Sequence, residues 1–163
     1  MNNFKKIKSK EVIIIDCEAS GLVKESYPIE VGVSFSGDSF GFLIKPDPSW
    51  NYWSIEAEKI HNIKKEKLLK EGISCYEAAI FLNNQLRGST IFSDASEFEN
   101  FWINKLFNIS GVEKMFEIES IYELSFDYER YKYIKEKISN LTVTHRAEND
   151  ANIIREAIEK SMK

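Results

Sequence analysis

The chain has 163 residues, 43% hydrophobic and 13% aromatic, with a formal net charge of −4 at pH 7. This length suffices for one sizeable core and is too short for two ordinary domains, so we predict a single domain over residues 1–163. The negative charge argues against a protein held to nucleic acid by bulk positive charge. It leaves room for a nucleic-acid enzyme, because clustered acids that hold divalent cations present a positive site to phosphates.

No run approaches the roughly 20 apolar residues that cross a bilayer. The first ten residues, MNNFKKIKSK, lack the apolar segment of a secretory signal. Cys17 and Cys75 form neither a spaced framework nor a CxxC pair. We therefore expect no membrane partner, a cytoplasmic location, and reduced thiols in or near the core.

The first part of the chain predicts a three-strand meander. Residues 11–16, EVIIID, form a β-branched run that is typical of a strand buried on both faces. Residues 27–35 alternate and carry Val and Ile, and the turn residues SGDS follow. A third strand at residues 40–44 then runs until Pro46 stops it.

Helices and then alternating strands and helices follow the meander. Ser54 and Ser74 are candidate helix caps. A short helix begins at Ser54, and a second helix runs over residues 74–87 until Gly88 ends it. The later predicted elements are strands at 89–94 and 115–124 and helices at 96–107, 126–139 and 149–162. This order predicts an α/β protein with a mixed central β-sheet flanked by helices, whose functional residues lie at strand ends and on facing helices.

Two acids end the first strand. Asp16 and Glu18 point to the same side of the pleat because they are two positions apart. A carboxylate at the edge of a core is costly unless it has a cation or a donor as partner. Ser20 and Gly21 follow at once and give a tight turn with free backbone donors. Taken alone, the acids also fit a strand that runs out into solvent.

Further acids stand near two helix starts. Asp150 lies in the first turn of the last helix, five residues after His145, and alone this arrangement is typical of a helix cap. Asp94 ends a short strand and Glu99 follows in the next helix, which alone is typical of a capping box. Taken together, these acids and one histidine favour phosphodiester hydrolysis by two metal ions.

The same segments, in the same order, resemble the DEDD superfamily of 3′-to-5′ exonucleases, in the DEDDh subgroup whose last motif contains histidine. Residues 13–22, IIIDCEASGL, resemble the first motif, a hydrophobic strand ending in DxE before a small hydroxyl residue and glycine. Residues 26–33, SYPIEVGV, resemble the second strand, and residues 145–151, HRAENDA, resemble the third motif. The resemblance covers nearly the whole chain and implies a single exonuclease domain with a ribonuclease H-like fold.

The middle motif departs from the family pattern. The family places a small polar residue, commonly Asn, at a strand end and an aspartate four or five residues later. Here Asp94 stands where the polar residue would be, and Glu99, with Trp102 three residues further on, stands where the acid would be. Glu99 is the favoured counterpart, and Asp94 is the alternative.

The resemblance implies a site and its partners. Asp16, Glu18, Asp150 and one middle-motif acid would hold two Mg²⁺ or Mn²⁺ ions about 4 Å apart. His145 would act as general base on the attacking water. The substrate would be the 3′ end of single-stranded RNA or DNA, and family habit alone suggests a homodimer. The expected contacts to the terminal nucleotide are Ala19, Ser20, Gly21 and Leu22.

Two rival interpretations stay open. A ribonuclease H-type endonuclease, or another two-metal phosphodiesterase, would share the acids but has less need of His145 five residues before Asp150. A degenerate nuclease domain that binds nucleic acid or a protein without catalysis is motivated by Glu99 and by the acidic composition. The sequence carries no signature that separates RNA from DNA.

A cluster of aromatic residues also leaves two interpretations open. Trp50, Tyr52 and Trp53 stand in the loop after the third predicted strand. Their rings could stack on bases, as in proteins that bind single strands. They could equally pack over the core or against a dimer partner.

Overall fold

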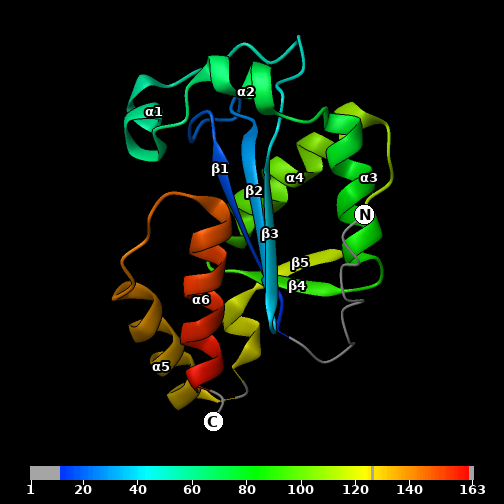
Figure 1. Cartoon of the computed structure of the whole chain (residues 1–163). Helices are drawn as coiled ribbons and strands as arrows, with labels where there is room; N and C mark the ends of the chain where they lie inside the picture. The colour runs from blue at the N-terminus through cyan, green and yellow to red at the C-terminus, as the bar shows by residue number, and fades with distance from the viewer. Residues whose placement is uncertain (1–11, 126, 162–163) are drawn as a thin grey trace.

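A computed structural model describes residues 12–125 and 127–161 (Figure 1). Three predicted element ends, at residues 11, 126 and 162, lie outside the described residues. The prediction that residues 1–10 lack a secretory signal also falls outside them. No helix in the described part of the chain is long and apolar enough to cross a bilayer. Cys17 and Cys75 are both buried, and both are free thiols.

Within the described residues, five strands form one mixed sheet in the order β3-β2-β1-β4-β5. The first three strands pair antiparallel as a meander, and β4 pairs parallel with both β1 and β5. The predicted α/β class, mixed sheet and meander are therefore confirmed. The strands are β1 (Ile14–Ala19), β2 (Pro28–Phe35), β3 (Asp38–Leu43), β4 (Thr90–Ser93) and β5 (Glu117–Ser120).

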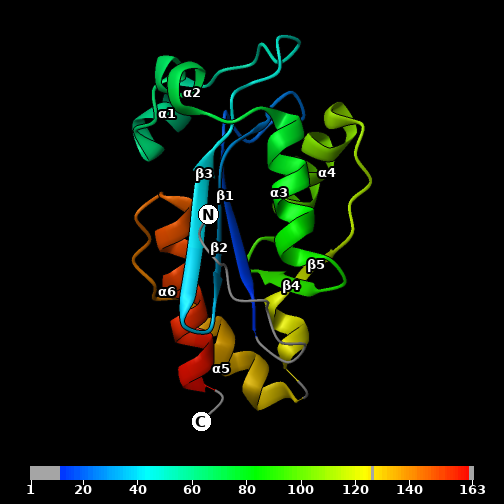
Figure 2. The same ribbon diagram turned by 45° about the vertical axis from the view of Figure 1, so that its right-hand side comes forward.

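Helices cover both faces of this sheet (Figures 1 and 2). One face is covered by α5 and α6, and the other by α3 and α4. The short helices α1 and α2 lie beyond the ends of the strands, at the top of both views. The helices are α1 (Ile55–His61), α2 (Lys65–Glu71), α3 (Cys75–Leu86), α4 (Ser96–Ser110), α5 (Tyr128–Ser139) and α6 (Ala147–Ser161).

The two faces of β1 contribute to two separate hydrophobic clusters. Ile13 and Ile15 pack in the cluster under α3 and α4. Ile14 packs in the cluster under α5 and α6. Because side chains alternate along a strand, Asp16 and Glu18 share the α6 side with Ile14. The strand that the sequence predicted to be buried on both faces therefore directs its two acids toward α6.

Local capping follows the predicted signals. The Ser54 hydroxyl accepts a hydrogen bond from the backbone N–H of Ala57, and Ser74 forms a complete capping box with Glu77. Gly88 follows α3 with φ of +75°, a left-handed conformation that favours glycine. The two predicted caps are confirmed, and they fix where α1 and α3 begin.

One predicted element assignment needs correction, and one short helix was not predicted. The predicted strand over 115–124 is a strand only from Glu117 to Ser120, and a 3-10 helix (Ile121–Leu124) follows. The Ser120 hydroxyl accepts from the backbone N–H of Tyr122, which turns the chain at this point. The sequence also did not predict α2 as a separate helix, and its first residues have no side-chain cap.

Glycines let α6 lie directly against the sheet beside Asp16. Asp16, Gly32 and Gly41 are neighbours across β1, β2 and β3. A Cβ at Gly32 would lie 2.1 Å from backbone atoms of Ala147 and Glu148, and one at Gly41 would lie 2.8 Å from the Glu148 Cβ. Both contacts are too short for any side chain, so the first turn of α6 requires glycine at these positions.

Candidate active site

A cavity of about 600 Å³ opens at the carboxyl end of β1. It lies where β1 and β4, which are parallel, end at the same edge of the sheet. The loop after β1, the start of α4, the segment around α1 and the start of α6 surround it. The structure brings all the predicted catalytic and metal-binding side chains into its lining, namely Asp16, Glu18, Asp94, Glu99, His145 and Asp150.

The two β1 acids share a crowded negative environment. Burial raises the pKa of Asp16 well above its usual value, and the charges of Glu99 and Glu18 raise it further. Burial, followed by the charge of Asp150, raises the pKa of Glu18 from 4.5 to about 8. Acids that converge in this way are destabilised when ionised, so this site favours bound cations.

Both middle-motif acids line the cavity, and they differ in their surroundings. Glu99 is 2% exposed, and the Ser93 hydroxyl donates a 2.6 Å hydrogen bond to its Oε2. Burial raises the pKa of Glu99 to about 7, although the Ser93 hydrogen bond lowers it. Burial also raises the pKa of Asp94. The charge of Glu99 acts on Asp16 more strongly than the charge of Asp94 does, which favours Glu99 as the partner of the β1 acids.

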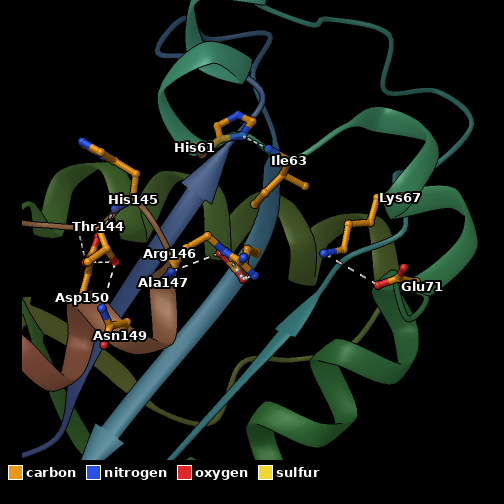
Figure 3. A network of polar contacts seen from close by, with 11 residues as sticks. His61, Ile63, Lys67, Glu71, Thr144, His145, Arg146, Ala147, Asn149 and Asp150 are labelled. Carbon is orange, nitrogen blue, oxygen red and sulfur yellow. Dashed lines mark hydrogen bonds and ion pairs between the residues drawn. The ribbon is translucent and has the colours of Figure 1, made fainter.

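Asp150 binds the loop that carries His145 (Figure 3). Its Oδ1 accepts hydrogen bonds from the Thr144 backbone N–H and hydroxyl, both at 2.7 Å. Its Oδ2 accepts from the His145 backbone N–H at 2.8 Å. His145 has φ of +56°, so these bonds hold it in a left-handed conformation that non-glycine residues rarely adopt. The five-residue spacing thus has a local cause, because a carboxylate in the first helical turn reaches back to these donors.

An ion pair that was not predicted from the sequence anchors α6. The Arg146 guanidinium donates from Nη2 to Glu30 Oε1 at 2.7 Å and from Nε to the same oxygen at 3.1 Å. The Ala147 backbone N–H donates to Glu30 Oε2 at 3.1 Å. Glu30 is the cross-strand neighbour of Glu18, and the charge of Arg146 lowers the pKa of Glu18. The sequence feature that could have indicated this ion pair is Glu30, a single acid within the apolar pattern of β2.

The predicted nucleotide contacts do not all reach the cavity. Ala19, Gly21 and Leu22 line it, and the Leu22 side chain is 74% exposed. Ser20 is fully buried and is not part of the lining. Its hydroxyl accepts a hydrogen bond from the Tyr27 backbone N–H at 3.1 Å, so it closes the turn after β1. The contact of Ser20 with the terminal nucleotide stays a prediction, and its side chain lies outside the lining of this cavity.

The aromatic cluster divides between packing and the site. Trp50 is buried and stacks on Tyr27 with ring centroids 5.1 Å apart. The Trp53 indole N–H donates to Glu58. Tyr52 lines the cavity, as does Phe98, which sequence reasoning had not assigned to the site. The apolar side of the cavity thus consists mainly of side chains without a recognisable motif.

One ligand atom from each of Glu18, His145 and Asp150 lies within 4.8 Å of the others, a group that could hold a metal ion. Carboxylate oxygens and an imidazole nitrogen are donors that divalent cations accept in proteins. Asp16 and Glu99 line the same cavity outside this tight group. The raised pKa values of Glu18 and Glu99 fit a site whose acids ionise fully only beside positive charge.

The mixed five-stranded sheet with helices on both faces has a ribonuclease H-like fold. Solved structures of exonuclease I share this fold. The zinc-bound complex of E. coli exonuclease I with single-stranded DNA matches with a TM-score of 0.70 and 10% identity, covering 96% of this chain and 41% of that one. E. coli exonuclease I in complex with a dT13 oligonucleotide matches with a TM-score of 0.70 and 11% identity, covering 93% and 40%.

Exonuclease I from Methylocaldum szegediense gives a TM-score of 0.59 at 13% identity, covering 70% of this chain and 28% of that one. The chain thus spans about two fifths of the length of the E. coli exonuclease I chains. No protein-family model and no curated protein sequence matches the chain. At these identities the likeness is one of fold.

Proposed function

We propose that the chain is a metal-dependent 3′-to-5′ exonuclease of the DEDDh type, acting on the 3′ end of single-stranded nucleic acid. One observation carries this proposal: the five predicted acids and the predicted histidine, which come from segments distant in sequence, line a single cavity. The resemblance of three sequence motifs and the shared fold of exonuclease I support it. Residues 1–163 would form a single exonuclease domain, and a cytoplasmic location and a homodimer stay predictions.

Asp16, Glu18, Glu99 and Asp150 are the residues that would hold two Mg²⁺ or Mn²⁺ ions, with Asp94 as the alternative to Glu99. When bound, such ions polarise the scissile phosphate and lower the pKa of a water molecule. Asp150 Oδ1 already accepts two hydrogen bonds, whereas Oδ2 accepts one. Since a carboxylate oxygen has two lone pairs, Oδ2 is the Asp150 atom that retains an acceptor position.

His145 is placed to take a proton at the edge of this site. Its side chain is exposed, and one of its ring nitrogens lies near the carboxylates of Glu18 and Asp150. The hydrogen bond from its backbone N–H to Asp150 fixes the position of the residue. The imidazole would accept the proton of the attacking water, a role typically worth about 10²- to 10⁴-fold in rate.

The apolar side of the cavity suits an unpaired base. Leu22 and Phe98 are both exposed, and both line the cavity that also contains the acids of β1 and α6. Exposed apolar side chains can contact the face of an unstacked base but cannot enter a duplex without unpairing it. Single strands are therefore the favoured substrate, consistent with the single-stranded DNA bound by the E. coli exonuclease I structures.

The experiment that tests this proposal is a time course on 5′-labelled single-stranded RNA and DNA in Mn²⁺, Mg²⁺ or EDTA. We expect a ladder that shortens from the 3′ end, needs the metal, and is lost in His145→Ala. Internal cuts in a duplex would instead indicate a ribonuclease H-type endonuclease. Binding without cleavage in any metal would indicate a degenerate nuclease domain.

The same assay assigns the middle acid. Glu99→Gln and Asp94→Asn are compared with Glu136→Gln, which changes an exposed acid on α5. We expect Glu99→Gln to lose activity and Glu136→Gln to retain it. Loss in Asp94→Asn alone would assign the metal to Asp94, and full activity in both variants would remove α4 from the site.

A further inference from the structure

An exposed strip of side chains continues from the candidate active site along α4. Phe98 lines the active-site cavity and also a second hollow that reaches Lys24 and Phe101. A third hollow continues past Phe101 to Lys105. We define the α4 strip as Lys24, Phe98, Phe101 and Lys105. Its three α4 residues are three and four positions apart, so they lie on one face of the helix.

The strip combines accessible rings with positive charge. Phe98 is 43% exposed and Phe101 is 40% exposed. The Lys105 Nζ donates to the carbonyl oxygens of Lys24 and Ser26, at 3.1 and 2.7 Å, and lies 5.5 Å from the centroid of the Phe101 ring. An ammonium group has three N–H donors, so Lys105 keeps one for another acceptor beside an exposed ring.

The remaining charges of the strip leave it open to phosphates. The Lys24 side chain is 87% exposed, and its only described ion pair is a 3.8 Å contact to Glu25, which is itself half exposed. Among the residues that line the second hollow, Glu97 is the single acid. Asn104 and Asn108 supply further polar groups in the third hollow. Rings flanked by ammonium and amide groups match the chemistry of single-stranded nucleic acid, whose bases stack and whose phosphates pair with lysine.

We infer that the α4 strip binds the part of a single-stranded substrate upstream of its 3′-terminal nucleotide, with a base on Phe101 and phosphates near Lys24 and Lys105. This inference rests on the proposed function for the identity of the polymer. A protein partner could also cover exposed rings, but continuity with the acid-lined cavity favours the strand. A polymer held at its 3′ end among the acids must leave the cavity, and the shared Phe98 marks this exit.

The test measures the affinity of the full chain for single strands of 3 and 12 nucleotides in EDTA, where cleavage does not interfere. We expect Phe101→Ala to weaken binding of the longer strand by about 5- to 100-fold and to leave the shorter strand unaffected. The matched control is Tyr128→Ala on α5, because Tyr128 is 70% exposed and also has a lysine, Lys132, 5.6 Å from its ring centroid. This control should bind both strands as the parent does.

A second measurement tests the phosphate contact. Lys24→Gln should make binding of the longer strand less sensitive to salt, by about 0.7 in the slope of log affinity against log salt concentration. An unchanged slope would remove Lys24 from the strand path. Because Lys24 is almost fully solvated, this variant should fold as the parent does.

Three results would overturn the inference. In the first, Phe101→Ala binds the longer strand as tightly as the parent does. In the second, it loses affinity for both strands equally. In the third, it changes the oligomeric state, which would make the strip a protein interface. The proposed function and this inference can fail independently. If the chain binds the longer strand through Phe101 but cleaves nothing, only the proposed catalysis is refuted. If the chain is an active exonuclease whose binding does not depend on Phe101, only the role of the α4 strip is refuted.

Discussion

Replacing Glu18 by Gln is expected to stabilise the metal-free protein at alkaline pH. Burial and the charge of Asp150 raise the pKa of Glu18 from 4.5 to about 8 in the folded chain. Between these values the folded chain keeps a proton that the unfolded chain has released. The contribution of Glu18 to stability is therefore fully present below about pH 4.5 and is lost as the pH rises through 8.

The magnitude follows from the size of the shift. A difference of about 3.5 pH units, at about 1.4 kcal/mol per unit, corresponds to about 5 kcal/mol in the free energy of unfolding. The acids of the cavity titrate together, so this value belongs to the cluster. Removing the charge of Glu18 alone should recover about 2 to 4 kcal/mol at pH 8.5.

Urea unfolding at pH 5.5 and pH 8.5 in EDTA measures this effect. The parent should lose stability between the two pH values, and Glu18→Gln should lose less. Glu97→Gln, which removes an exposed acid, should follow the parent. Saturating Mn²⁺ should remove the advantage of Glu18→Gln, because a bound cation stabilises the ionised carboxylate in the parent only. A parent equally stable at both pH values, or a variant without any gain at pH 8.5, would refute a shared desolvated site for these acids.

Three further predictions address the supporting groups of the site. Ser93→Ala removes the donor that lowers the pKa of Glu99, so the rising limb of the rate–pH profile should move to higher pH, and an unmoved limb would exclude Glu99 as a ligand. In Asp150→Asn the side chain cannot accept all three hydrogen bonds from the preceding loop, so the free energy of unfolding in urea should fall by about 1 to 3 kcal/mol. The same variant should abolish cleavage, and a full cleavage rate would contradict the proposed role of Asp150. Gly32→Ala places a Cβ 2.1 Å from the backbone of Ala147 and should destabilise the chain by about 3 kcal/mol or more, which an unchanged melting temperature would disprove.

Local signals explain what the sequence predicted well. The run before Asp16 is apolar on both sides of the pleat, and Ile14 and Ile15 are each 0% exposed as that pattern requires. Ser54 and Ser74 cap helices because a short hydroxyl side chain reaches the free N–H groups of a first turn. These features depend on neighbours a few residues away, so a single sequence contains them.

Long-range and weakly marked features were missed. The contact between Glu30 and Arg146 joins residues 116 positions apart, and no local pattern encodes such a pair. The Ser20 hydroxyl accepts a hydrogen bond from the Tyr27 backbone across a turn whose path the sequence does not define, whereas its contact with the terminal nucleotide stays a prediction. The alternation of β5 continues past Ser120, although the chain there leaves the sheet.

The close approach of α6 to β2 also limits how this site could be rebuilt elsewhere. A Cβ at Gly32 would lie only 2.1 Å from the backbone of α6, so any side chain there would push the helix outward by roughly 1 to 2 Å to restore normal contact distances. Cation–ligand distances tolerate only about 0.2 Å. An engineer who grafts the acids of β1 and α6 onto another sheet would therefore need to graft the glycines of β2 and β3 with them. These glycines carry no reactive group, yet they set the distance between α6 and the sheet and therefore the distance between the carboxylates of α6 and those of β1.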